Sequence, residues 1–275
     1  LLIANYDINE RRKNEPIQSS LFGDGDYEFN NLQDYRYKKP NHTIISAKIA
    51  GYIADKGFDV ALLLCDTDAP PLPLLVSPSD IETEKSLGSI LAAARITENL
   101  VMQNAITFKK NRHIVAFGLM KGENSFSYPK YTQVQAKELI DALRDIADFV
   151  VIDCSCHLSD DILSTVSLIE ADCVLRLINC DLKSISYLSS QLPLLADGRF
   201  KSDKQLKAAN NVKSIHSREN IEQIIGGVTF TVPHSDLVER QYLEGELLKD
   251  TPVKRESKEF RVMIEQIAEE VFELD

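Results

Sequence analysis

The sequence lacks several features that define whole classes of protein. It has no excess of positive charge, because 42 Asp and Glu residues outnumber 31 Lys and Arg residues and give a formal net charge of −11. Non-specific nucleic-acid binding needs a cationic face, and so does electrostatic docking on an anionic membrane. The chain also has no apolar run of about 18 residues, which argues against a membrane-spanning helix. We therefore expect no specific nucleic-acid partner and no direct membrane insertion.

Glycine and proline are also scarce. With 11 Gly, 10 Pro and 44% hydrophobic residues among 275, the chain can bury a sizeable core, and wholesale disorder is not expected. No Gly-x-Gly-x-x-Gly motif follows a strand, so a dinucleotide-dependent oxidoreductase is a remote alternative. Cys65, Cys173 and Cys180 lie in or beside apolar runs, as expected for reduced thiols in the cytoplasm. Because the sequence starts at Leu1 rather than Met, we also expect that residues have been trimmed before it.

What is present is an alternation of short apolar runs with helical patterns. The predicted strands lie near residues 1–7, 60–65, 113–118, 149–152, 173–178 and 227–232, and the predicted helices near 43–55, 86–94, 132–146, 160–170, 184–195 and 257–274. This alternation predicts an α/β fold with a doubly wound, mostly parallel sheet and helices on both faces. We expect a single domain over residues 1–275, with an insertion or long loop at 8–41. That loop is either a surface crossover or a lid over the site.

Two aspartates follow two of the predicted strands. Asp66 comes after the run ALLLC and Asp153 after FVVI. In an α/β sheet, acids at the carboxyl ends of the strands lie where a phosphate-bound Mg²⁺ would be held. The alternative interpretation is that each aspartate caps the turn or helix that follows it, which is a favoured role for this side chain.

Four segments, taken in order, resemble those of one known family. The run from His42 to Asp68 is similar to the helix and strand that follow a phosphate loop, and FVVID followed by CSCHL resembles a Walker B strand and switch II. Residues 171–184 (ADCVL and DLKS) resemble the next strand and turn, and residues 225–236 resemble the segment that borders an adenine pocket. Together they cover most of the chain and resemble the MinD/ParA class of P-loop ATPases.

This resemblance implies a P-loop NTPase-like fold and a set of site residues. Thr43, Asp66 and Asp153 would be the Mg²⁺ ligands if a nucleotide binds, and Asp66 and Asp153 would be the catalytic candidates if the protein is active. Pro233 would lie beside the base. Relatives of this class sandwich ATP between two subunits, so the resemblance also implies a homodimer.

The phosphate loop departs from the family pattern. Residues 38–43 read KKPNHT and contain no glycine. His42 stands at the position of the phosphate-binding lysine, Asn41 at the preceding glycine, and Lys38 one position away from the family's additional lysine. A phosphate loop needs inward-pointing N–H groups and a lysine, whereas proline has no N–H and histidine is mostly neutral at pH 7. Each lost charge-assisted bond removes about 1.5–3 kcal/mol.

We therefore expect a vestigial nucleotide site made of Lys38, Asn41, His42, Thr43, Asp66 and Pro233. No cofactor is required, ATP and Mg²⁺ bind weakly, and efficient ATPase activity is not expected. The alternative is an active Mg-ATPase switch that uses Lys38 and Thr43 in a rearranged loop. Family members that keep the fold but lose the loop residues recur among TadZ/CpaE-like proteins.

The resemblance thus implies a bacterial, cytoplasmic localisation or assembly factor of a pilus or secretion machine. Its protein partners would recruit it to the inner membrane or the cell pole. The terminal segment from Ser257 carries an apolar stripe, but its charges from Glu265 onward are all acidic. A membrane-anchoring helix normally has Lys or Arg on its polar face, so this helix is expected to pack on the domain or on a partner.

Overall fold

The computed structural model of the chain describes residues 4–5, 41–83, 85–155, 161–195, 197–200, 203, 205–216, 226–252, 254 and 257–274. The predicted insertion at 8–41 lies outside the described residues, apart from Asn41, and so does Lys38. Residues 156–160, which include the end of the run CSCHL (154–158) that resembles switch II, are also outside them.

The described strands form two hydrogen-bonded sheets, which lie side by side at β1 and β6 and are described as two halves. The first half is built around a strand that is buried along its whole length. β2 (Val60–Leu64) runs parallel to β5 (Ile114–Phe117) on one side and to β6 (Phe149–Asp153) on the other. β4 (Ile106–Phe108) and β3 (Ile81–Thr83) continue this half in antiparallel pairing beyond β5, giving the order β3-β4-β5-β2-β6. The uninterrupted apolar run of β2 is typical of a strand covered on both faces.

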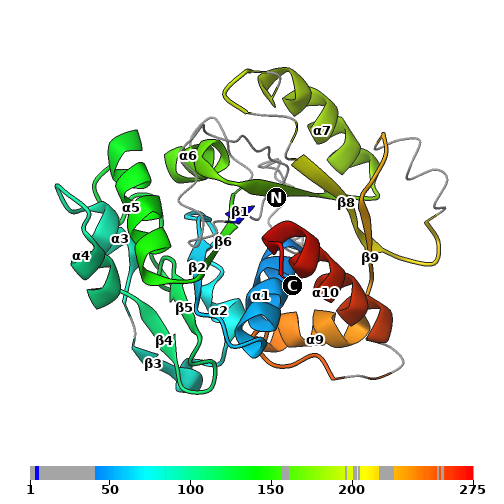
Figure 1. Cartoon of the computed structure of the whole chain (residues 1–275), viewed down its shortest axis with the longest axis horizontal. Coiled ribbons are helices and arrows are strands. Elements are labelled where there is room, and N and C mark those ends of the chain that lie inside the picture. The colour runs from blue at the N-terminus through cyan, green and yellow to red at the C-terminus, as the bar shows by residue number, and fades with distance from the viewer. Residues whose placement is uncertain are drawn as a thin grey trace, which may run out of the picture.

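The second half has the order β1-β7-β8-β9. β7 (Cys173–Asn179), β8 (Gln205–Val212) and β9 (Phe230–Pro233) are parallel neighbours, while β1 (Ala4–Asn5) pairs antiparallel with β7. β1 also contacts β6, so it lies between the two halves (Figure 1). The predicted mostly parallel sheet is therefore confirmed, with antiparallel pairing at β1, β3 and β4.

Helices cover both faces of the sheet, as predicted (Figure 1). One core contains the buried residues of α3 (Leu87–Leu91), α4 (Glu98–Gln103), α5 (Gln133–Ile146), α6 (Ile162–Glu170) and α7 (Leu182–Leu195). The other contains those of α1 (Asn41–Asp55), α2 (Leu72–Leu75), α9 (Asp236–Glu244) and α10 (Lys258–Phe272). Alternate residues of β2 enter the two cores, Leu63 one and Leu62 the other, which is the period-two pattern of a strand.

Side-chain caps set where several helices begin. Thr132 and Gln135 form a reciprocal capping box at the start of α5, which satisfies two amide groups that the helix cannot bond itself. Asp161 caps α6 through the amide of Ser164, and Ser235 caps α9. α9 ends at Gly245, whose φ of 67° is left-handed and whose added Cβ would lie 2.6 Å from the Pro73 carbonyl oxygen. Only glycine fits that position without strain.

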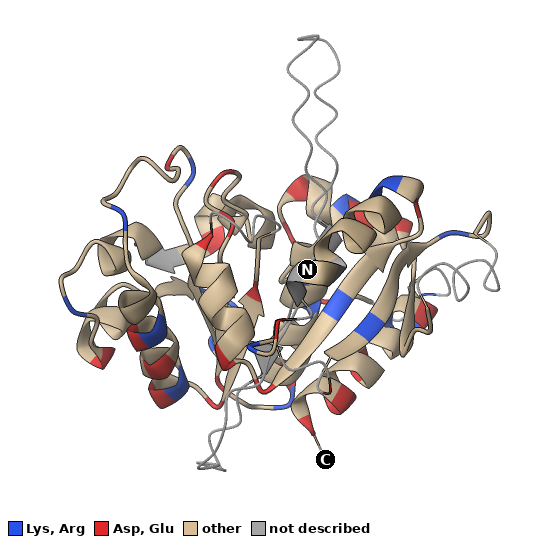
Figure 2. Ribbon diagram, turned by 90° about the horizontal axis from the view of Figure 1, so that it is seen from above, with Lys and Arg blue, Asp and Glu red and all other residues tan. Residues whose placement is uncertain are grey.

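The C-terminal helix α10 packs on the domain, as expected from its acidic charges. Its apolar stripe, including Phe260, Ile264, Ile267 and Phe272, is buried against α1 and β9. Its exposed side carries acidic residues such as Glu270. Figure 2 shows acidic and basic residues scattered over the helices. In the described part of the chain, no helix is both long and apolar enough to cross a membrane.

Candidate functional site

The first turn of α1 lies against the carboxyl end of β6 and directs three side chains at one carboxylate. Thr43 Oγ1 donates a hydrogen bond of 2.6 Å to Asp153 Oδ2, and Ser46 Oγ donates one of 3.0 Å to Oδ1. His42 Nδ1 lies 3.1 Å from the same Oδ1. We call His42, Thr43, Ser46 and Asp153 the Asp153 cluster. The three side chains belong to residues 42–46. Thr43 and Ser46 lie on the same face of α1 because they are about one helical turn apart.

The Asp153 cluster is closed to solvent. Thr43 and Ser46 are fully buried and Asp153 is 1% exposed, whereas the His42 side chain is 15% exposed. A buried carboxylate is tolerated only when hydrogen-bond donors replace its water. Both oxygens of Asp153 are satisfied in this way, so the cluster is a complete hydrogen-bonded unit without any ligand.

Asp66 lies close to this cluster but bonds within its own turn. Its Oδ1 accepts hydrogen bonds from the amides of Asp68, at 3.0 Å, and Ala69, at 2.9 Å. Burial raises the pKa of Asp66, and the Ala69 amide and then His42 oppose this rise. The influence of His42 and Asp153 on this pKa places the three residues in one electrostatic environment. The turn-capping role considered for Asp66 is thus present in the structure.

A second buried polar group follows β6. Ser155 Oγ and Ser164 Oγ each donate a hydrogen bond of 2.5 Å to Asp161 Oδ2, and the Ser155 amide donates to Ser164 Oγ at 2.8 Å. Burial raises the pKa of Asp161 against the effect of these bonds. These hydrogen bonds link the residue that follows the end of β6 by two positions to the start of α6.

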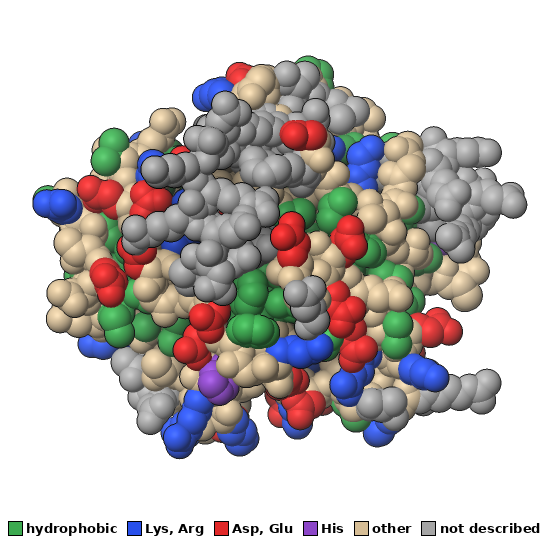
Figure 3. Space-filling view, in the orientation of Figure 1, with side chains coloured by type: hydrophobic (Ala, Val, Ile, Leu, Met, Phe, Trp, Pro, Cys, Tyr) green, Lys and Arg blue, Asp and Glu red, His purple; other side chains and the backbone are tan. Residues whose placement is uncertain are grey.

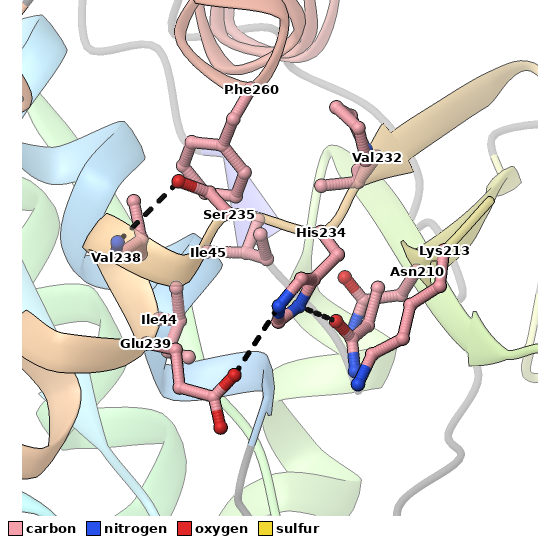
Figure 4. A pocket seen from close by; sticks show the side chains of 12 residues that line it. Ile44, Ile45, Asn210, Lys213, Val232, His234, Ser235, Val238, Glu239 and Phe260 are labelled. Carbon is pink, nitrogen blue, oxygen red and sulfur yellow. Dashed lines mark hydrogen bonds and ion pairs between the residues drawn. The ribbon is translucent and has the colours of Figure 1, made fainter. Parts of the chain in front are cut away.

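Pro233, the predicted neighbour of a base, lines a cavity of about 230 Å³ beside the start of α1 (Figure 4). The cavity lies between α1, β8, β9, α9 and α10, and its lining combines apolar and polar side chains. The lining residues are Ile44, Ile45, Asn210, Asn211, Lys213, Val232, Pro233, His234, Ser235, Val238, Glu239 and Phe260. Its volume is below the roughly 300–1,000 Å³ of typical ligand pockets.

The imidazole of His234 points between polar groups from two elements at the cavity wall (Figure 4). Its Nδ1 lies 2.7 Å from Asn211 Oδ1, at the end of β8. Its Nε2 lies 2.8 Å from Asp236 Oδ1 and 3.4 Å from Glu239 Oε2, both in the first turns of α9. We call His234, Asp236 and Glu239 the His234 cluster.

The structure thus brings several of the predicted site residues together. His42, Thr43 and Asp153 are in direct contact, Asp66 is adjacent to them, and Pro233 lines the neighbouring cavity. Asn41 begins α1, two residues earlier than predicted, and its side chain lies outside the described atoms, as does all of Lys38.

Sequence reasoning missed Ser46, Asn211 and Glu239 as site residues. The position of Ser46, three residues after Thr43 in a predicted helix, was the available signal, because residues at this spacing share a helix face. Asn211 and Glu239 carry no comparable signal, since β8 brings one of them to the cavity and α9 the other.

No protein-family model matches the sequence, and no curated protein matches it significantly. Solved structures do match. A ParA family ATPase from Chlorobium tepidum has a TM-score of 0.65 at 14% identity, with 84% of this chain and 95% of the other covered. The cell division ATPase MinD of Pyrococcus furiosus has a TM-score of 0.64 at 18% identity, with 84% and 94% covered.

Two further matches were solved with a ligand or a partner. A putative plasmid partition protein from Borrelia burgdorferi, bound to AMPPNP, has a TM-score of 0.63 at 16% identity and covers 85% of this chain and 96% of its own. The MinC:MinD cell division complex of Aquifex aeolicus gives 0.62 at 13%, with 85% and 92% covered. At these identities the likeness concerns the fold. The chain has the fold of the MinD/ParA-type P-loop ATPases, which confirms the expected class.

Proposed function

We propose that this protein is a MinD/ParA-like factor that positions or assembles protein partners, and that its nucleotide chemistry is weak or lost. The observation that carries this proposal is the Asp153 cluster. The threonine and aspartate expected to face Mg²⁺ are hydrogen-bonded to each other at 2.6 Å. The residue at the lysine position, His42, contacts the same carboxylate instead of extending toward a phosphate.

The energetics of this cluster oppose ATP hydrolysis. Thr43 and Asp153 keep lone pairs for a Mg²⁺ ion even while they are hydrogen-bonded to each other, so the weakness lies in phosphate binding. Each charge-assisted bond that a phosphate loses is worth about 1.5–3 kcal/mol, and only His42 among the four cluster residues can carry positive charge. The residues of the cluster therefore fit a triphosphate poorly.

Weak nucleotide binding retains some support from the cavity next to α1. Pro233, which the resemblance places beside the base, lines it, and so do Ile44 and Ile45, which follow Thr43 directly. A base could enter there without catalysis. In this proposal ATP and Mg²⁺ are not required cofactors, and Thr43, Asp66 and Asp153 are Mg²⁺ ligands only when nucleotide binds.

The finer functional assignment is also a proposal. We assign the protein to TadZ/CpaE-like factors of pilus or secretion machinery, cytoplasmic and recruited to the inner membrane or pole by partners. The MinC:MinD complex is a solved case of this fold bound to a protein partner. The described part of the face in Figure 3 mixes acidic and basic side chains. Such a mixture, with a net charge of −11, favours protein partners over nucleic acid.

Phosphate release by the purified protein tests the proposal. We expect turnover at background level in the wild type and in Asp153→Asn, with Asp141→Asn, an exposed aspartate on α5, as the matched control. The rival hypothesis, an active switch with a rearranged loop, requires turnover that Asp153→Asn abolishes and Asp141→Asn leaves intact. That result would overturn the proposal.

We also propose that residues 1–275 form one domain that dimerises without nucleotide, because a lost phosphate loop can no longer gate the contact. Light scattering with and without ATP tests this. A mass of twice 30.9 kDa under both conditions supports a constitutive homodimer. A mass of 30.9 kDa under both refutes it, and a dimer that forms only with ATP revives the active switch.

A further inference from the structure

The His234 cluster places one imidazole nitrogen against two carboxylates. The Asn211 carboxamide oxygen, 2.7 Å from Nδ1, can only accept, so Nδ1 carries a proton. If the imidazole is neutral, Nε2 presents a lone pair. That lone pair then faces carboxylate oxygens at 2.8 Å from Asp236 and 3.4 Å from Glu239. A positive charge therefore belongs at Nε2, either a proton on the ring or a metal ion between the three atoms.

The spacing of these atoms matches that of ligands around one metal ion. Zinc bonds imidazole nitrogen and carboxylate oxygen at about 2.0–2.2 Å, so two of its ligands lie about 3–3.5 Å apart. The two distances from Nε2 fall close to that range. Among the described residues, His234, Asp236 and Glu239 are the one group of three such side chains whose ligand atoms all lie within 4.8 Å of one another.

We propose that His234 Nε2, together with one oxygen each from Asp236 and Glu239, binds a divalent transition metal of the zinc class. Two acids and one imidazole form a ligand set that such ions accept. The Asn211 contact to the other ring nitrogen would fix the tautomer and the ring orientation, which is the role of a supporting partner around a metal.

The helix that carries two of the ligands is fixed in the fold, while the cluster itself is partly exposed. Ser235 caps α9, and Val238 and Gln241 on the inner face of this helix are buried. His234 and Glu239 are 20% and 26% exposed, while Asp236 is 84% exposed and free to change rotamer to complete the site. His234 and Glu239 also line the 230 Å³ cavity. Three protein ligands leave a position for water or for a small oxygen- or nitrogen-donor ligand in that cavity.

Acidic residues in the first turns of a helix have a simpler explanation, because they are favoured by the helix dipole. That explanation accounts for Asp236 and Glu239, and either a proton on Nε2 or a metal ion holds the imidazole toward both acids. Zn²⁺ binding at this site distinguishes the metal from the proton. The metal site also does not depend on nucleotide binding, since none of its three ligands belongs to the Asp153 cluster.

Titration of the full chain with Zn²⁺ by calorimetry, against a competing chelator, tests the proposal. We expect one site that weakens by at least about tenfold in His234→Asn and in Glu239→Gln. The matched control is His113→Asn, since His113 Nδ1 lies 2.8 Å from Asp59 Oδ1 in an exposed pair with only one carboxylate. Asn211→Gly, which suits the φ of 54° there, should weaken Zn²⁺ by about 10–100-fold without removing a ligand.

Co²⁺ as a spectroscopic probe separates this site from the cysteines. Nitrogen and oxygen ligands give weak visible bands, whereas thiolate ligands add an intense near-ultraviolet band. Equal Zn²⁺ affinity in His234→Asn and the wild type, or a thiolate band that accounts for the whole stoichiometry, would overturn the proposal. Unchanged circular dichroism of each variant shows that loss of binding is not loss of fold.

Discussion

The Asp153 cluster and the His234 cluster use the same kinds of side chain and reach opposite states. In the first, one carboxylate accepts from a threonine, a serine and a histidine, and it is 1% exposed. In the second, two carboxylates share a single imidazole, and Asp236 is 84% exposed. The ratio of donors to acids decides the difference. Where hydrogen-bond donors outnumber carboxylates, the group is closed and structural. Where carboxylates outnumber donors, the group requires a cation, either a proton or a metal ion.

The largest effect should follow from removing the acceptor of the closed cluster. Asp153→Ala leaves the buried Thr43 and Ser46 hydroxyls and His42 without their shared partner, so we expect a loss of about 3–5 kcal/mol in the free energy of unfolding. Urea denaturation measures it. Asp141→Ala, at an exposed aspartate, should change stability by less than about 0.5 kcal/mol. Equal effects of the two substitutions would show that the cluster contributes little.

Lys48, also on α1, shows what burial does to a cation that is not hydrogen-bonded to an acid. Its Nζ donates to Gln241 Oε1 and to the Lys249 carbonyl oxygen, each at 2.7 Å. Burial lowers the pKa of Lys48 to about 7, and Asp250 partly opposes this. Between pH 7 and the unfolded pKa of 10.5, the unfolded state binds more protons, so stability should rise with pH across that window by a few kcal/mol. This gain in the free energy of unfolding disappears as the pH falls toward 7.

Denaturation curves at several pH values between 7 and 10 check this dependence. Lys48→Met should flatten it, because no buried amine remains to lose its proton on folding. Lys137→Met, at an exposed lysine of α5, should leave the slope unchanged. A slope that survives in Lys48→Met would assign the pH dependence to another group.

Restoring a cation tests whether His42 keeps the Asp153 cluster closed. In the double variant Asn41→Gly, His42→Lys, a lysine regains the reach to a phosphate and a glycine the backbone freedom. One recovered charge-assisted bond is worth about 1.5 kcal/mol or more, so ATP affinity should rise at least about tenfold. A fluorescent ATP analogue measures the change. Equal affinity before and after would mean that other parts of the loop exclude nucleotide.

The smallest effect is expected at the open cluster. Asp236→Asn removes one of two acids from a largely exposed position, so stability without metal should change by less than about 0.5 kcal/mol. With saturating Zn²⁺ the wild type should melt at a higher temperature than the variant, since an ion that binds only the folded state stabilises it. Thermal denaturation with and without Zn²⁺ reads both effects, and identical shifts would separate Asp236 from the metal.

The strands that could be predicted from the sequence are those covered by a hydrophobic core on each face. β2 and β6 consist of apolar runs because both of their faces are covered, and both were predicted almost to the residue. β8 was missed because its buried centre is Ala208, Ala209 and Asn210, which are small or polar. β3 and β4 have three residues each, too few for any period to emerge.

The site divides along similar lines. Thr43 and Asp153 were found because each has a local context, a helix start and a strand end. Their direct contact joins residues 110 positions apart, and no local pattern encodes that distance. α9 had recognisable signals in Ser235 and Gly245, but residues 233–236 were interpreted as the end of a nucleotide-binding segment, and so the helix after them was overlooked.

The packing of α10 on α1 has a consequence for the order of events during synthesis. The apolar face of α1, including Ile49 and Ile53, is buried in part by Phe260, Ile264 and Phe272. The ribosome makes these roughly two hundred residues after α1, a delay of about 10–40 s at usual elongation rates. During that interval β2 and β6 can pack on α1, but the part of its apolar face that α10 covers stays exposed on the nascent chain. Chaperone demand should therefore fall sharply only once α10 has left the exit tunnel.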